Sequence, residues 1–157
     1  MGYQIMNMID AIYHIQYNPF KYGEYIYRFY SNLPEYQNNI LLLPLIIPLC
    51  IHSKYTNKIT GSNKRSSLLT IFENKKELYD LQERIDALQM LSRQSLQYCL
   101  GKELLYLNID ELNIYANNLD KKTVKKFNPD SKIAERLALL FGKYSVDEIY
   151  SYLGVKL

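Results

Sequence analysis

The spacing of apolar residues predicts a chain built mainly of helices. In Gln4–Gln16 the apolar side chains recur at helical intervals, and Asn18 with Pro19 is typical of a helix cap and its first turn. The next segment carries aromatic and aliphatic side chains at steps of three and four until Leu33–Pro34, where proline disfavours helical backbone. We therefore expect two amphipathic helices in succession.

Residues Ile40–Ile51 are almost entirely apolar and include Pro44 and Pro48. A membrane-spanning helix needs about twenty such residues, so this shorter run is expected to be a core segment covered on all sides. A polar loop is expected over Thr56–Arg65, followed by a short helix over Ser66–Phe72.

The second half of the chain changes period once. Asn74, with Glu77 three residues later, predicts the start of a long helix over Lys75–Leu100. Two short strands around a polar turn are expected between residues 103 and 115. A hairpin directly after a long helix has the outline of a winged-helix unit.

Two further helices are expected at the C-terminal end. Asn128-Pro129-Asp130 predicts a helix to Phe141, and the capping box Ser145–Glu148 begins one that ends at Gly154. The predicted fold class is mainly α with one small β-hairpin, an α+β arrangement that is winged-helix-like. Residues 1–157 are expected to form a single compact domain because no repeat or linker interrupts them.

Composition narrows the function classes. The net charge is only +3, which excludes polycations and acidic tails, and the chain has sixteen Tyr but no Trp. Cys50 and Cys99 are too few for a disulfide framework and are expected to be buried thiols. The beginning of the sequence lacks the pattern of a secretory signal, so we expect a cytoplasmic protein.

The residues offer little support for catalysis. Gly61-Ser62-Asn63-Lys64 lacks the upstream glycine of a phosphate-binding loop, and His14 and His52 have no nearby second ligand for a metal. We therefore expect no catalytic residue, no metal and no cofactor. A small hydrolase in which Cys50 or Cys99 pairs with a histidine remains an open alternative.

Two surfaces are candidates for binding. Lys121, Lys122, Lys125 and Lys126 lie in an expected loop, and residues 120–143 hold seven basic and three acidic residues. These lysines could contact DNA phosphates without sequence preference, or simply keep the loop soluble. Tyr25, Tyr27 and Tyr30 lie on or beside the face opposite the apolar stripe of their helix, so some are expected to point outward as partner anchors.

The order of the segments resembles that of the middle component of bacterial ABC three-component systems, the group that includes the small C subunit of Lamassu-type defence complexes. The resemblance spans almost the whole chain and rests on weak motifs in a distinctive order. Its motif positions are Asn18, Pro19, Pro48, Leu49, His52, Gly154 and Val155. The family ending usually reads Gly-Val-Arg-Pro, whereas this chain ends Gly-Val-Lys-Leu.

The resemblance implies a non-catalytic adapter. In such systems the middle subunit sits with an SMC-like or Rad50-like ATPase and with an effector, often a nuclease, in antiphage or antiplasmid defence. DNA would then be met through the complex, without sequence preference, and no membrane would be involved. A stand-alone winged-helix-like DNA-binding regulator is the alternative interpretation.

Overall fold

The computed structural model describes residue 8 and residues 17–157. The expected helix over Gln4–Gln16 therefore lies outside the described residues, except for Met8. The described elements, in chain order, are α2 (Pro19–Asn32), η1 (Asn39–Leu42), α3 (Leu43–Cys50), α4 (Ser53–Thr60), α5 (Leu68–Ile71), η2 (Lys75–Leu78), α6 (Leu81–Ala87), α7 (Gln89–Gly101), β1 (Leu105–Asn108), β2 (Asn113–Ala116), α8 (Lys121–Lys125), η3 (Pro129–Lys132), α9 (Ile133–Phe141) and α10 (Val146–Leu153).

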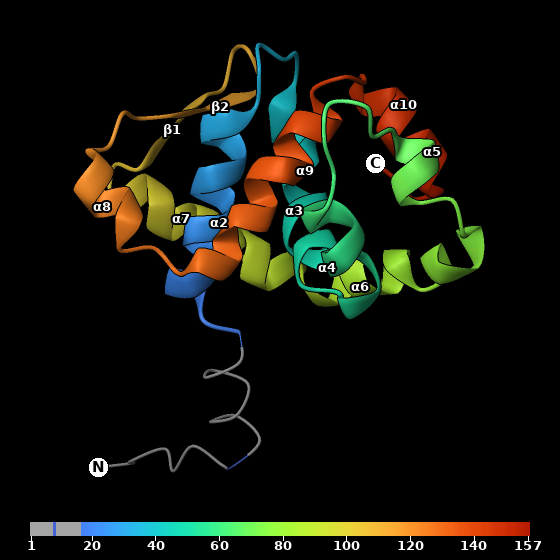
Figure 1. The fold of residues 1–157 in the computed structure, drawn as a ribbon. Coiled ribbons are helices and arrows are strands. Elements are labelled where there is room, and N and C mark those ends of the chain that lie inside the picture. Colours follow the sequence, from blue (N-terminus) through green and yellow to red (C-terminus); the bar gives the residue numbers. More distant parts are fainter. Residues whose placement is uncertain (1–7, 9–16) are drawn as a thin grey trace, which may run out of the picture.

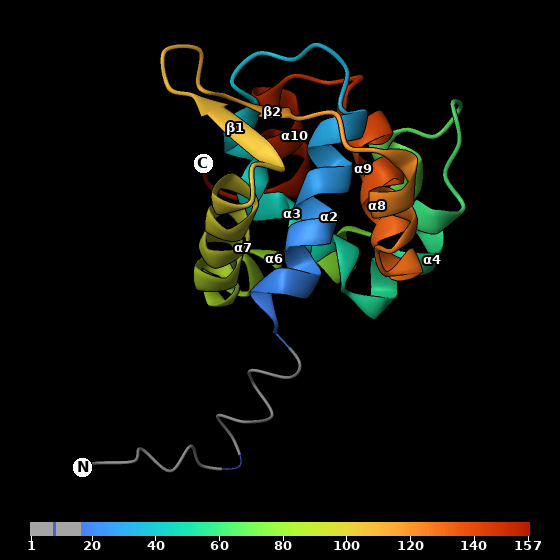
Figure 2. The ribbon, with the colours of Figure 1, turned by 90° about the vertical axis from the view of Figure 1, so that its left-hand side faces the viewer.

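Helix α2 is the central element of the body. It packs between α7 on one side and α9 on the other, and it also contacts α3 (Figures 1 and 2). Gly23 allows the close approach to α7, because a Cβ atom there would lie 2.7 Å from Cδ1 of Tyr98. The sequence thus places its smallest residue where two helices meet most tightly.

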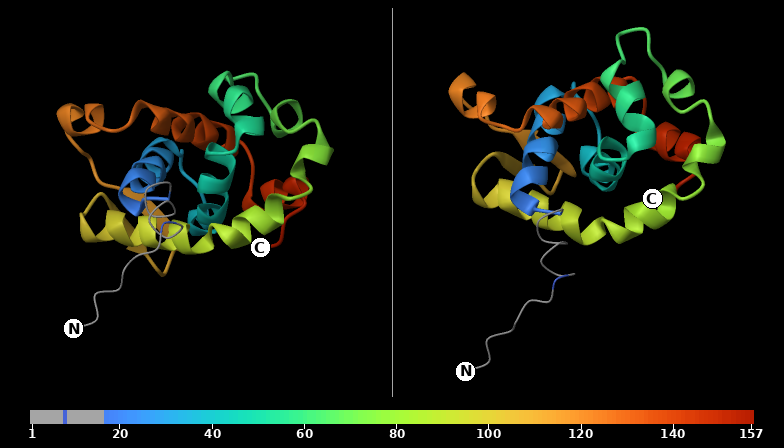
Figure 3. Two further views of the ribbon diagram at one scale, coloured as in Figure 1. Left: turned by 90° about the horizontal axis from the view of Figure 1, so that it is seen from below. Right: turned by 60° about the horizontal axis from the view of Figure 1, so that its bottom comes forward.

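The apolar run forms the centre of the hydrophobic core, as expected. Leu45, Ile46, Ile47 and Leu49 of α3 are fully buried among α2, α4, α6 and α9. Seen from below, α6 and α7 curve along one side of this core and α9 lies on the other (Figure 3). The chain therefore covers its own most apolar segment.

The prediction of a long helix over Lys75–Leu100 is wrong. The segment divides into η2, α6 and α7, with Asp80 and Leu88 outside helical geometry at ψ values of 6° and 5°. Leu81, Ile85 and Leu91 are nevertheless all buried, because the break lets each short helix keep its apolar side on a rounded core. The periodicity was a correct guide to burial but could not reveal the break.

Two expected loops are also partly helical. Ser53–Thr60 forms α4, where Tyr55 and Ile59 reach into the core, so the polar loop begins only at Gly61. The lysine segment forms the short helix α8, capped by Asp120, whose Oδ1 accepts a hydrogen bond from the Thr123 amide at 2.7 Å. Both segments became helical because caps and tertiary contacts outweighed their polar composition.

The hairpin and the remaining caps agree with the prediction. β1 and β2 pair antiparallel with Leu107 opposite Ile114. Ser145 and Glu148 form the reciprocal capping box of α10, which ends at Gly154 with a left-handed φ of 70°. The fold is thus mainly helical with one two-stranded hairpin.

No single helix among the described residues is long and apolar enough to span a membrane. Asn39–Cys50 and Ser53–Thr60 would suffice together by length and composition, but a bend of 106° separates them.

Candidate interaction site

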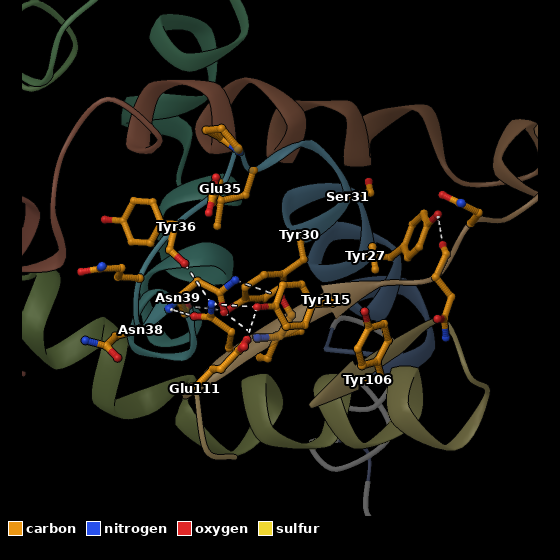
Figure 4. A pocket seen from close by; sticks show the side chains of 18 residues that line it. Tyr27, Tyr30, Ser31, Glu35, Tyr36, Asn38, Asn39, Tyr106, Glu111 and Tyr115 are labelled. Carbon is orange, nitrogen blue, oxygen red and sulfur yellow. Dashed lines mark hydrogen bonds between the residues drawn. The ribbon is translucent and has the colours of Figure 1, made fainter. Parts of the chain in front are cut away.

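A cleft of about 980 Å³ lies between the C-terminal half of α2, the connection from Leu33 to Asn39, and the hairpin (Figure 4). Its walls are mainly tyrosines and amides, and the carboxylates of Glu35 and Glu111 also line it. The residues that shape it are Tyr27, Tyr30, Tyr36, Asn39, Tyr106 and Tyr115. Such side chains offer contact area with polar tips, which suits a protein or peptide ligand.

Two asparagines hold the hairpin against the helical body. The Asn39 amide donates to the Ile114 carbonyl at 2.9 Å and accepts from the Ile114 N–H at 2.6 Å. In return, Asn113 accepts from the Asn39 N–H at 2.8 Å and donates to the Tyr36 carbonyl at 2.9 Å. The outer edge of β2 is therefore paired by side chains instead of by a third strand.

Three of the four tyrosines of α2, the ones predicted to be partner anchors, are buried. Tyr25, Tyr27 and Tyr30 are each only 5% exposed, so the expectation that some of them point outward is wrong. Tyr30 donates to the Asn39 carbonyl at 3.0 Å, and Tyr27 donates to the Asn117 carbonyl at 2.9 Å. Because α2 is packed on several sides, the face opposite its apolar stripe is also covered, and these hydroxyls brace the cleft from inside.

A stacked, partly exposed aromatic pair lies on the hairpin, and Phe20 and Tyr79 are exposed elsewhere on the body. Tyr106 and Tyr115 stack with ring centroids 5.3 Å apart, and Tyr106 is 51% exposed. The Tyr115 hydroxyl donates to the Glu111 carboxylate, and this hydrogen bond raises the pKa of Tyr115. Cross-strand neighbours of this kind were within reach of sequence reasoning, since the register follows once the turn is located.

The four lysines of the basic cluster are exposed on and beside α8. Arg28, only 5% exposed, fixes this helix to the body: it donates to the Val124 carbonyl at 3.3 Å and forms an ion pair with Glu135 at 2.6 Å. Its Nε also donates to Ser131 Oγ at 2.6 Å. The structure thus brings together, on one anchored turn, Lys121, Lys122, Lys125 and Lys126. The sequence did not indicate the role of Arg28, which stands in it only as a charged residue among aromatic ones.

The thiols are placed for packing. Cys50 and Cys99 are buried and unpaired by disulfide, and burial raises the pKa of both, that of Cys99 to about 12. His52 caps α4, with Nδ1 accepting from the Lys54 amide at 3.0 Å, whereas His14 lies outside the described residues. The described part of the chain brings together no group of three or more His, Cys, Asp or Glu side chains that could hold a metal.

Most of the motif positions lie at or next to the ends of helices. Asn18 accepts from the Phe20 amide at 2.8 Å and Pro19 opens α2, while His52 caps α4. Pro48 and Leu49 are buried in α3, Gly154 ends α10 and Val155 packs against the core. Pro48 and Leu49, inside α3, are the exceptions among the seven positions.

A family model described as "ABC-three component (ABC-3C) system Middle Component 3" matches residues 6–157. No curated protein and no solved structure matches the chain.

Proposed function

The chain belongs to the Middle Component 3 family of ABC-three component systems, and we propose that it is a non-catalytic adapter that links an SMC-like or Rad50-like ATPase to an effector, in the form of a nuclease. The setting of this role would be the cytoplasm, in defence against phages or plasmids of the Lamassu type. The family match over nearly the whole chain is the observation that carries the proposal, because a component of a multi-subunit system implies partner subunits.

The surface of the body supports a linking role. The basic turn at α8 presents four exposed lysines, whereas the hairpin loop presents Asp110 and Glu111 beside exposed apolar side chains. Two surfaces of opposite charge on one small body suit two different partners, because electrostatic complementarity selects partners and repels wrong ones.

We propose that DNA held by the assembled complex contacts the lysines of the basic turn. Lysine ammonium groups contact phosphates as point charges, so this contact would carry no base sequence information. The stand-alone regulator is the competing proposal for the same lysines, and it requires binding of one operator sequence by a symmetric dimer.

The test is co-expression of this chain with the ATPase and effector subunits of its own three-component system. The adapter proposal requires one complex that contains all three chains, and it requires the ATPase–effector association to be lost when this chain is omitted. A complex that assembles equally well without this chain would overturn the proposal. A homodimer that binds one DNA sequence tightly on its own would favour the regulator.

A further inference from the structure

The loop between β1 and β2 exposes large aliphatic side chains that the turn itself does not require. Ile109 is 72% exposed and Leu112 is 44% exposed, and the loop projects from the body (Figure 2). Leu112 also has a left-handed φ of 54°. Glycine or asparagine relieves the strain of such a turn position, whereas a branched aliphatic side chain does not. The sequence therefore retains an apolar side chain at a cost to the turn.

The loop is held rigidly despite its exposure. The Leu112 carbonyl accepts from the Ile40 N–H at 3.2 Å, and the Leu112 N–H donates to the Ile109 carbonyl at 3.2 Å. Asn108 Oδ1 accepts from the Glu111 N–H at 3.1 Å. Because the loop is already ordered, binding to a partner costs little conformational entropy in this loop.

The charge of the loop selects the kind of partner. Asp110 and Glu111 stand between the two aliphatic residues and are exposed. Carboxylates at this position repel DNA phosphates and anionic lipid headgroups. An apolar protein socket with lysines or arginines at its rim complements both features.

We infer that the tip of the hairpin, Ile109–Leu112, is a preformed knob that inserts into an apolar socket with a basic rim on a partner subunit of the complex. This inference rests on the proposed adapter function and names the surface that serves it. The strained Leu112 supplies the apolar contact, and Asp110 supplies the charge that faces the rim.

Leu112→Asn separates this role from a merely structural one, because asparagine suits the left-handed backbone. We expect the melting temperature of the isolated variant to rise by about 3 °C, because the strain of the backbone is relieved. Its affinity for the partner subunit should fall about tenfold or more. Glu103→Asn is the matched control: Glu103 is exposed and has a left-handed φ of 58°, but it is not apolar. That variant should gain stability and keep full affinity.

Asp110→Lys provides the second arm of the test and leaves the apolar residues intact. The affinity for the partner subunit should fall, and it should no longer weaken when salt is added. The probes are the purified ATPase and effector subunits, each titrated with this chain. If both Leu112→Asn and Asp110→Lys bind with full affinity and the wild-type complex is intact, the knob inference is wrong but the adapter proposal stands. Failure of the wild-type chain to bind either subunit would instead overturn the adapter proposal. Self-association of the isolated chain that Leu112→Asn abolishes would assign the knob to a second copy and overturn the inference.

Discussion

The side-chain amide of Asn39 pairs with both backbone groups of Ile114, donating to its carbonyl and accepting from its N–H. Both residues are buried, at 5% and 1% exposure. Asn39 thus satisfies the backbone hydrogen-bonding groups at the edge of β2, which in a larger sheet would pair with a neighbouring strand. The position of the hairpin on the helical body depends on this contact.

Asn39→Ala is expected to destabilise the protein by about 2 kcal/mol, since it leaves a buried N–H and a buried carbonyl of Ile114 unpaired. Urea unfolding of the two proteins measures the difference. Asn39→Asp is the control that keeps the acceptor for the Ile114 N–H but removes the donor to its carbonyl. An unchanged urea midpoint for Asn39→Ala would contradict the structural role of the pair.

Arg28→Met is expected to cost about 2 kcal/mol, because it removes the buried partner of an ion pair whose other member, Glu135, is 35% exposed and partly screened by water. It should also loosen α8, whose Val124 carbonyl Arg28 contacts, so amide exchange over residues 121–126 should speed up. Hydrogen exchange with mass spectrometry measures both effects. A double variant in which Glu135→Leu accompanies Arg28→Met should recover part of the stability, because no unpaired charge then remains.

Tyr30→Ala is expected to destabilise the fold by about 4 kcal/mol, as for other large aromatic side chains deleted from a core. Tyr30→Phe removes only the hydroxyl that donates to Asn39 and should cost about 1 kcal/mol. Thermal unfolding distinguishes the two. Equal and small losses for both variants would show that Tyr30 is not a core residue, and would restore its candidacy as a surface anchor.

Replacing Lys121, Lys122, Lys125 and Lys126 by Glu within the assembled complex is expected to weaken binding to unrelated DNA duplexes alike. If all four lysines contact phosphates, the slope of log affinity against log salt should become shallower by about 3.6. A matched variant changes four exposed lysines outside the cluster to Glu, namely Lys54, Lys75, Lys76 and Lys102. Equal effects of the two sets would reduce the basic turn to a contributor of net charge, and loss of assembly would assign it to an acidic partner surface.

Stability is expected to fall between pH 9 and pH 12. Burial raises the pKa of Cys99 from its ordinary 9.0 to about 12, and that of Tyr55 and Tyr150 from 10.0 to about 12. The folded protein keeps these protons where the unfolded chain has lost them, so rising pH favours unfolding. The urea midpoint measured from pH 8 to pH 11.5 should decline, and Cys99→Ala should reduce the decline. A constant midpoint over that range would contradict the burial of these groups.

The sequence by itself determined several helix caps, the hairpin and the burial of the apolar run. Caps act within a few residues, so Asn18 with Pro19, Ser145 with Glu148, and Gly154 were interpretable from local chemistry alone. The apolar run of α3 was correctly predicted to be covered, because an element that is apolar all round can only be buried. The turn between the two strands was equally local.

The tertiary structure decided which faces stay exposed and how distant segments meet. Nothing local indicated that α7 and α9 would flank α2, so the burial of Tyr25, Tyr27 and Tyr30 could not be foreseen from their spacing. The pairing of Asn39 with Ile114 spans 75 positions of the chain, and the contact of Arg28 with Glu135 spans 107. Polar side chains such as those of Asn39 and Arg28 can form hydrogen bonds with many partners, and only the packing of the helices selects one.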